Sequence, residues 1–203
     1  MSSWSDETRR PLVHISTDQF YTGDGTMAHD EGHPVTIQNN YASTKFIGEQ
    51  LALASGNSLV LRTAIVGIRG WERLTFAEWA LDAVLNDRGV RLFQDAYTSA
   101  IDVESVALTI HGLLDGGHRG LFNVGTQEVY SKADFVLKIS HALGKPLTNA
   151  TLGSVKEMPA RRGDSLGLDV TKVQEALSRQ MPTLEDVVTN VIQQHKTRNN
   201  NAL

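Results

Sequence analysis

A tyrosine and a lysine stand four residues apart, at Tyr41 and Lys45, near the start of a segment that predicts a helix. At this spacing both side chains project from one face of the helix and can act together. A free phenol has a pKa of about 10, and a neighbouring ammonium group lowers that value towards neutral pH. The pair therefore suits a tyrosine that donates a proton to a substrate, supported by Lys45.

A hydroxyl group from a strand end could complete this pair. The stretch "PLVHIST" predicts a short strand that leads into Ser16-Thr17-Asp18, and Thr17 is placed to orient the substrate oxygen that Tyr41 must reach. The competing interpretation is a surface contact between tyrosine and lysine, which is the usual explanation of this spacing alone. The catalytic interpretation gains weight because the helix lies between two apolar strands.

The elements that must position these residues alternate between strands and helices. Residues 41–55 predict a helix with Ile47, Leu51 and Ala54 along one face, and residues 58–67 form the nearly continuous apolar run of a strand covered on both sides. Capping and periodicity predict further helices after Thr75, Asp102, Ser131 and Thr183 (the last to about His195), a short helix at 169–177, and strands at 90–93 and 120–125. This alternation predicts an α/β protein with parallel strands.

Composition excludes several classes of protein. The 203 residues carry a net charge of −4 with lysine and arginine scattered, so we expect no nucleic-acid partner and no membrane-binding face. Without cysteine, disulfides and thiolate chemistry are excluded, and the seven histidines show no ligand spacing that predicts a metal site. No apolar run suits a membrane span and the start lacks the apolar core of a signal peptide, so we expect a cytoplasmic protein.

Six stretches in order carry a resemblance to a known family: "VHISTDQFYTGDG", "NNYASTKFIGEQ", "LVLRTAIVG", "DAYTSAIDVESVAL", "GLFNVGTQEVYSKADFVLKI" and "RRGDSLGLDVTKVQEAL". They are similar to segments of the extended short-chain dehydrogenase/reductase superfamily and, more narrowly, of the dTDP-4-dehydrorhamnose reductase family. Several matches in order are far more specific than a lone Tyr-x-x-x-Lys. The resemblance implies an oxidoreductase that uses NADPH or NADH to reduce the 4-keto group of a nucleotide sugar.

The resemblance also implies roles for individual residues. Tyr41 would protonate the C4 oxygen, Lys45 would hold the nicotinamide ribose and Thr17 would hydrogen-bond the reacting oxygen. The implied cofactor-binding residues are Ser16, Tyr41, Lys45, Arg62, Thr63 and Ala64, and the implied substrate-binding residues are Asp18, Trp71, Arg161 and Arg162. A solvated loop pair is an equally good explanation of the two adjacent arginines.

Two features depart from the family pattern. Ile65 stands where close relatives have a tryptophan, which leaves the identity of the keto-sugar open. The family also begins with a strand and a Gly-x-x-Gly-x-x-Gly turn that binds the cofactor pyrophosphate, and this chain has no such turn. We therefore expect a partial Rossmann-like, doubly wound parallel sheet made of the later strands only. Residues 1–70 would form what remains of that domain, and residues 71–203 mostly a small α/β substrate-binding lobe, with one strand returning to the sheet near 120–125.

The absent turn leaves three accounts open. The chain could be a fragment of a longer reductase, which we favour. It could be completed by another polypeptide. It could also be a non-catalytic binding or regulatory protein, similar to the regulatory subunit of methionine adenosyltransferase. As partners we expect a nucleotide-sugar substrate and either a second copy in a homodimer or a missing N-terminal segment.

Overall fold

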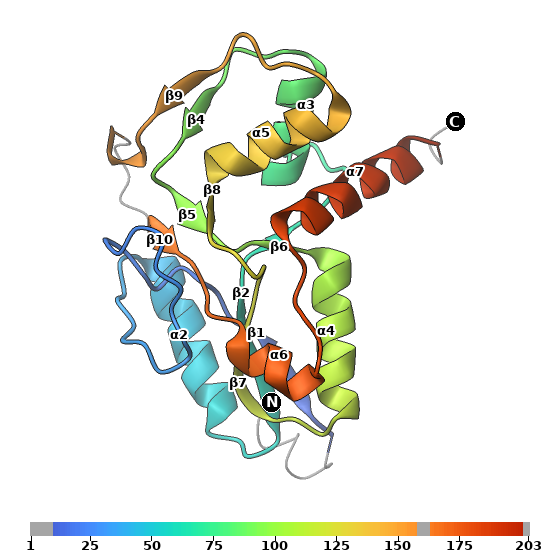
Figure 1. Cartoon of the computed structure of the whole chain (residues 1–203). Helices are drawn as coiled ribbons and strands as arrows, with labels where there is room; N and C mark the ends of the chain where they lie inside the picture. The colour runs from blue at the N-terminus through green and yellow to red at the C-terminus, as the bar shows by residue number, and fades with distance from the viewer. Residues whose placement is uncertain (1–9, 158–162, 201–203) are drawn as a thin grey trace.

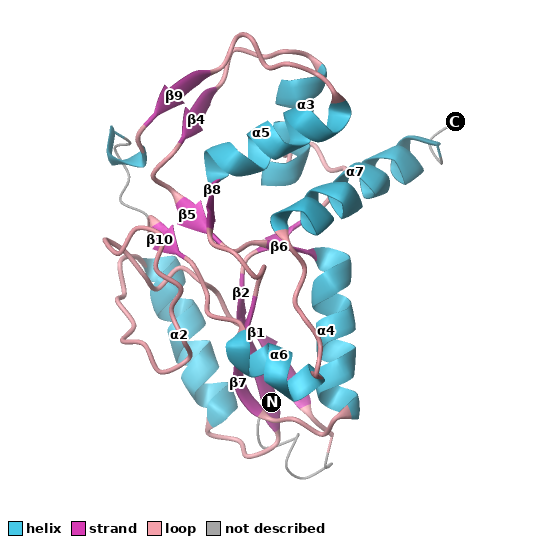
Figure 2. Ribbon diagram, viewed as in Figure 1, coloured by secondary structure: helices cyan, strands magenta, loops and turns pink. Residues whose placement is uncertain are grey.

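The computed structural model describes residues 10–157 and 163–200, which form a mixed α/β fold (Figures 1 and 2). Three parallel strands build its main sheet: β1 (Leu12–Ile15), β2 (Ser58–Thr63) and β7 (Gly120–Val124), in the order β1-β2-β7. Ile15 pairs with Leu61 and Thr63 pairs with Val124, so all three strands end at the same edge. The predicted α/β class with parallel strands is confirmed.

Strand β2 is buried along its whole length, as its apolar run predicts. Helix α2 (Asn40–Leu53) follows β1 and covers one side of the sheet, whereas α4 (Val103–Asp115) lies on the other side (Figure 1). Short helix α6 (Thr171–Leu177) packs beside β7 and α4. The sheet is therefore covered on both faces by helices that come from distant parts of the chain.

The predicted apolar stripe of α2 is wrong. Ile47 and Leu51 are 55% and 64% exposed, and the buried residues of the helix are Ala42, Glu49 and Ala52. The reason is that α2 approaches the sheet with small side chains and one carboxylate, which pairs with a charge on β2. Apolar periodicity therefore predicted correctly that this segment is helical, but it predicted the wrong side of the helix to be buried.

Helices α3 (Phe76–Leu85), α4 and α5 (Lys132–Leu143) begin where local chemistry predicts. Both α3 and α5 start with a complete capping box, and Asp102 caps α4 through the Ser105 amide. Gly144 ends α5 in the left-handed conformation, with φ of 60°. Each of these ends is set by a few adjacent residues, so the sequence is sufficient to place it.

The part of the molecule shown above the sheet in Figure 1 contains α3, α5 and α7 (Leu184–Asn200). Short strand pairs accompany these helices: β3 (Ile65–Val66) with β6 (Ile101–Asp102), β4 (Arg91–Phe93) with β9 (Thr151–Gly153), and β5 (Tyr97–Thr98) with both β8 (Tyr130–Ser131) and β10 (Ser165–Leu166). A short 3₁₀ turn, η1 (Val155–Glu157), follows β9. Helices α4 and α6 also lie beside the main sheet (Figure 1). The segment from residue 71 onwards therefore contributes two helices as well as the expected strand β7 to the part of the molecule that contains the main sheet.

Two element boundaries differ from the sequence prediction. The run 58–67 divides at Ala64 into β2 and β3, because β3 leaves the main sheet and pairs with β6. Helix α7 continues to Asn200 rather than ending near His195. Arg198 in its last turn donates a hydrogen bond of 3.0 Å to the Arg69 carbonyl, which ties this end of the helix to the loop after β3.

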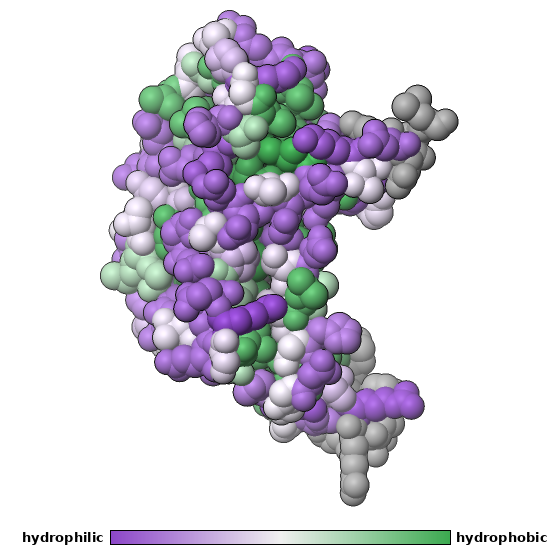
Figure 3. Space-filling view, turned by 45° about the vertical axis from the view of Figure 1, so that its right-hand side comes forward, coloured by the Kyte–Doolittle hydropathy of each residue, from purple (hydrophilic) through white to green (hydrophobic). Residues whose placement is uncertain are grey.

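The face shown in Figure 3 is mainly hydrophilic and is hollowed between the end of α7 and the lower part of the molecule. Beneath the surface, one apolar cluster joins β2 and β7 to α3, α4, α5 and α7.

Among the described helices, none combines the length and apolar character that crossing a membrane requires.

Candidate active site

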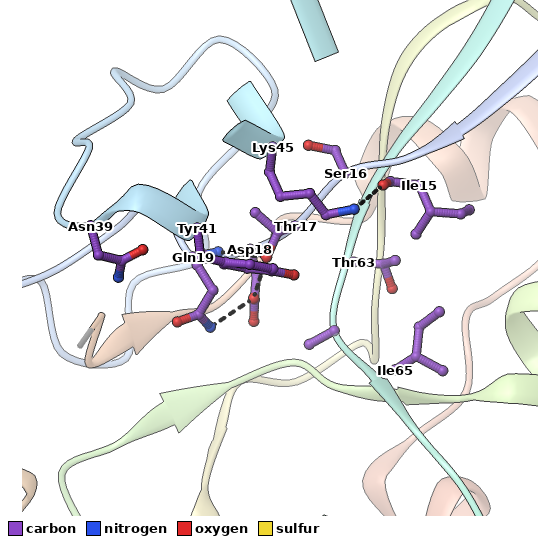
Figure 4. A pocket seen from close by; sticks show the side chains of 11 residues that line it. Ile15, Ser16, Thr17, Asp18, Gln19, Asn39, Tyr41, Lys45, Thr63 and Ile65 are labelled. Carbon is purple, nitrogen blue, oxygen red and sulfur yellow. Dashed lines mark hydrogen bonds between the residues drawn. The ribbon is translucent and has the colours of Figure 1, made fainter. Parts of the chain in front are cut away.

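A cleft of about 580 Å³ opens where β1 and β2 end (Figure 4). Thr17, Tyr41 and Lys45 all line it, so the structure brings the three predicted catalytic residues to one place. The complete lining is Ile15, Ser16, Thr17, Asp18, Gln19, Asn39, Tyr41, Lys45, Thr63, Ala64 and Ile65. We call these residues the cleft.

Tyr41 and Lys45 reach the cleft from the first turns of α2. Asn39 caps this helix by accepting a hydrogen bond of 2.9 Å from the Ala42 amide, which fixes where the helix begins. The Tyr41 side chain is 54% exposed and therefore accessible to a ligand. Lys45 Nζ donates a hydrogen bond of 2.7 Å to the Ile15 carbonyl, and an ammonium group has three such donors. This bond holds the charge at the end of β1 and leaves donors for a ligand.

Several polar atoms of the cleft are only partly satisfied. Within the described residues, the buried Thr63 Oγ1 and Asp18 Oδ2 have no hydrogen-bond partner. Thr17 Oγ1 accepts a bond of 3.2 Å from the Gln19 amide and makes only a long 3.5 Å contact with Asp18 Oδ1. Because buried polar groups normally find partners, these atoms mark a place where a ligand or water completes the bonding.

The carboxyl group of Asp18 is strongly affected by this environment. Burial raises its pKa to about 6, because charge is costly away from water, and a 3.0 Å hydrogen bond from the Gln19 side chain offsets that effect only in part. Asp18 can therefore change its charge near neutral pH, at the floor of the cleft.

A second set of polar side chains lies between the sheet and α2, and we call Ser16, Tyr21, Glu49 and Arg62 the network. Arg62 donates to both carboxylate oxygens of Glu49, at 3.0 and 2.6 Å, and Ser16 donates to the same carboxylate at 2.7 Å. The Tyr21 hydroxyl accepts from Arg62 at 2.8 Å. Burial alone would lower the pKa of Arg62, but the hydrogen bonds and charge of Glu49 outweigh burial and raise it.

The network changes the interpretation of two predicted cofactor-binding residues. The Arg62 guanidinium is nearly completely buried and bound by Glu49, and the side chain is not part of the cleft lining. Ser16 lines the cleft, but its hydroxyl is directed to Glu49. These placements argue against cofactor binding through either side chain, whereas Thr63 and Ala64 do face the cleft.

The predicted substrate-binding residues are divided. Asp18 lines the cleft, but Trp71 is 68% exposed on the loop after β3, where the Arg69 guanidinium lies 4.5 Å from its ring centroid. Trp71 is therefore not brought to the cleft. Arg161 and Arg162 lie outside the described residues.

Sequence reasoning missed some of the lining. Gln19 and Asn39 contribute polar groups that the sequence did not select. Ile65, which the sequence singled out only as a departure from the family pattern, forms an apolar wall and is 46% exposed. Asn39 directly precedes the observed start of α2, two residues before the predicted start at Tyr41, and an asparagine near a helix start is a capping signal that could have placed it here.

The residues present fit the nicotinamide end of a dinucleotide. An ammonium group with spare donors, an unpartnered threonine hydroxyl and the small side chain of Ala64 share one open cleft. Donors and acceptors of this kind suit the hydroxyl and amide groups of a nicotinamide riboside.

Comparisons with known proteins point in the same direction. The family model described as RmlD substrate binding domain matches residues 1–197. The chain is 31% identical over 188 residues to a probable low-salt glycan biosynthesis reductase of Haloferax volcanii, covering 89% of this chain and 62% of the relative. It is also 31% identical over 166 residues to a probable dTDP-4,6-dihydroxy-2-methyloxan-3-one 4-ketoreductase of Streptomyces antibioticus, covering 76% and 53%.

A solved structure shows the same fold. The NADP complex of dTDP-4-dehydrorhamnose reductase from Bacillus anthracis superimposes with a TM-score of 0.83 at 22% identity, covering 95% of this chain and 68% of that chain. The chain thus spans 62% or less of the length of the curated relatives named above. The match at this low identity supports the Rossmann-type fold expected from the sequence.

Proposed function

Since this chain belongs to the RmlD substrate binding domain family, we propose that it carries the proton-donating and substrate-binding part of a reductase that acts on the 4-keto group of a nucleotide sugar. The observation that supports this proposal is the cleft itself, where Thr17, Tyr41 and Lys45 meet at the carboxyl end of a parallel sheet. In α/β sheets of this kind, ligands bind outside the carboxyl ends of the strands. Relatives named as sugar-nucleotide reductases support the substrate class.

In the proposed reaction, Tyr41 donates its phenolic proton to the oxygen of the keto group as that oxygen gains negative charge. Thr17 donates a hydrogen bond to the same oxygen, because its hydroxyl is not committed to a strong bond within the protein. Both groups then stabilise charge that develops only in the transition state, which is where such groups accelerate a reaction.

Lys45 supports both partners. Its ammonium group stabilises the phenolate that remains on Tyr41 and can donate to ribose hydroxyls while Ile15 holds it in place. Thr63 and Ala64 would line the nicotinamide position. A reduced nicotinamide, NADPH or NADH, would supply the hydride when bound.

On the substrate side, we propose that Asp18 accepts a hydrogen bond from a sugar hydroxyl through Oδ2, which has no partner within residues 10–157 and 163–200. Ile65 forms an aliphatic wall where an indole would offer a stacking surface, so the sugar must be held by other contacts. Arg161 and Arg162 remain candidates for the phosphates of the nucleotide, since phosphates require cationic partners. Trp71 remains a candidate only for stacking on the base, because it lies outside the cleft.

The direct test compares turnover by the unmodified chain and by its Tyr41→Phe variant. The assay supplies NADPH or NADH with a dTDP-4-keto-6-deoxy sugar and follows oxidation of the nicotinamide. Loss of the proton donor should slow turnover by about 10²–10⁴-fold without changing the fold. Thr44→Ala is a matched control, because it removes an exposed hydroxyl from the same helix outside the cleft.

Equal turnover by the unmodified chain and Tyr41→Phe would refute the role of the phenol. Binding of both ligands without any turnover by the unmodified chain would refute the enzyme proposal and favour a binding or regulatory protein. Thr44→Ala should keep the unmodified rate in either case.

A further inference from the structure

The loop between β1 and α2 gathers three side chains that the proposed reaction does not use. One ligand atom from each of Asp24, His29 and His33 lies within 4.8 Å of the others. All three residues come from the segment that joins Thr17 to the start of α2, and they are five and four residues apart. The segment forms no helix or regular strand, so the four-residue spacing of His29 and His33 did not by itself show that Asp24 joins them.

His29 is held in a fixed orientation. Its side chain is completely buried and stacks on Tyr21 with ring centroids 4.1 Å apart. Its amide donates to the Gly167 carbonyl at 3.0 Å, and its own carbonyl accepts from the Asp169 amide at 2.8 Å. The imidazole therefore cannot turn away from its neighbours without breaking several contacts.

The hydrogen bond on one side of the ring decides what the other side can do. His29 Nδ1 lies 2.8 Å from the Gly167 carbonyl oxygen, and a carbonyl can only accept, so Nδ1 carries the proton. In the neutral ring, Nε2 then carries a lone pair and can only accept a hydrogen bond, yet it lies 3.3 Å from Asp24 Oδ2, which is also an acceptor. Two acceptors at this separation repel each other unless a proton or a cation lies between them.

The separation and the third residue favour a cation. Two ligands about 2.0–2.1 Å from a tetrahedral zinc ion lie about 3.3–3.4 Å apart, which is the observed spacing of His29 and Asp24. A proton needs only these two partners, but His33 also converges on them, with its ring centroid 4.5 Å from that of His29. The Nδ1–carbonyl bond of His29 is the outer contact that histidine ligands of metals usually make.

Asp24 is also positioned by its surroundings. It stands between Gly23 and Gly25, whose φ angles of 84° and 62° allow a tight turn that other residues would strain. The Asp24 amide donates to Ser165 Oγ at 3.0 Å, which fixes the turn against β10. The carboxylate side chain is 41% exposed, so an ion can enter from solvent.

We propose that Asp24, His29 and His33 bind a divalent transition-metal ion of the zinc type, with water as the fourth ligand. Two imidazoles and one carboxylate form a donor set that suits zinc, and three protein ligands leave one position open. The bound ion would cross-link the loop that carries Thr17 at one end and Tyr41 at the other. This proposal does not depend on the reductase function.

The test titrates Zn²⁺ into the full chain, without a histidine tag and after treatment with a chelator, by isothermal titration calorimetry. We expect one ion per chain and a higher midpoint of thermal unfolding when zinc is present. Asp24→Asn and His33→Gln should each weaken zinc binding by at least about 10-fold and so reduce the thermal shift at a given zinc concentration. His29 is left unchanged because its buried ring also supports the fold.

His141→Gln, which changes an exposed histidine at the end of α5, is the matched control and should bind zinc like the unmodified chain. Replacement of zinc by Co²⁺ should give the intense visible bands of a tetrahedral site in the unmodified chain and in the control. Absence of zinc binding, or binding that survives both Asp24→Asn and His33→Gln, would overturn the proposal.

Discussion

The cleft and the network lie at the same end of the sheet but differ in how completely the protein satisfies their polar atoms. Arg62 and Thr63 show the contrast most simply, because they are adjacent in β2 and their side chains point in opposite directions. Arg62 binds Glu49 and Tyr21, whereas the buried hydroxyl of Thr63 has no partner among the described residues. The polar side chains of the network bind one another, whereas some polar atoms of the cleft have no hydrogen-bond partner among the described residues.

The largest effect on stability should follow from breaking the network. Glu49→Ala leaves the Arg62 charge buried without its counter-ion, so we expect the free energy of unfolding to fall by about 3–5 kcal/mol. Urea unfolding followed by circular dichroism measures this loss. Glu185→Ala removes an exposed carboxylate, paired with Lys138, and should cost less than about 1 kcal/mol.

A Glu49→Met/Arg62→Met double variant sharpens this test, because it removes both charges and keeps the volume apolar. It should recover much of the stability lost in Glu49→Ala. If Glu49→Ala costs no more than the Glu185→Ala control, the network has no special structural role.

In the cleft, we expect the buried carboxyl group of Asp18 to destabilise the folded protein when it is charged. The pKa of Asp18 is about 6 in the folded protein against 3.8 for the ordinary group. Between these values the folded state binds more protons than the unfolded state, so stability falls as pH rises from about 4 to about 6, by about 3 kcal/mol in all.

Asp18→Asn should remove this slope and stabilise the protein at pH 7. Urea unfolding of both proteins at several pH values measures the effect. A stability that stays level across this window in the unmodified chain, or that falls equally in Asp18→Asn, would contradict a buried, poorly paired carboxyl group.

The smallest effects should distinguish two single hydroxyl groups. Ser16→Ala removes a bond to Glu49 and should cost about 1–3 kcal/mol, because the buried carboxylate loses a donor. Thr63→Val removes a hydroxyl that has no hydrogen-bond partner in the described part of the chain and should change stability by less than about 1 kcal/mol. Thermal unfolding of the two variants side by side measures the difference, and equal losses would erase the distinction between network and cleft.

The sequence predicted the positions of elements whose signals are local. The capping boxes at Thr75 and Ser131 start α3 and α5, and the buried apolar run gave β2. Tyr41, Lys45 and Thr17 could be selected because a helical spacing and a strand end each restrict where side chains can go. The sequence could not show which side of β2 each side chain faces. Arg62 and Thr63 are therefore equally plausible cofactor contacts until the ion pair of Arg62 with Glu49 is known.

Other features depend on contacts between distant residues and have no local signal. Glu49 of α2 can be buried because it pairs with Arg62 of β2. With Glu49 facing the sheet, Ile47 and Leu51 lie on the exposed side of the helix. Likewise, Asp24, His29 and His33 converge because an irregular loop folds against Gly167 and Ser165. Neither arrangement follows from apolar periodicity, and the four-residue spacing of His29 and His33 does not by itself bring Asp24 to them.

The most direct test of the central claim is methyl NMR of the full chain during titration with NADPH. We expect the methyl signals of Ala64 and Ile65, which line the cleft, to shift, while those of Ala42 and Ala52, on the buried face of α2, stay unchanged. Shifts confined to these two alanines of α2, or no shift at any of the four positions, would contradict the assignment of the cleft as the binding site.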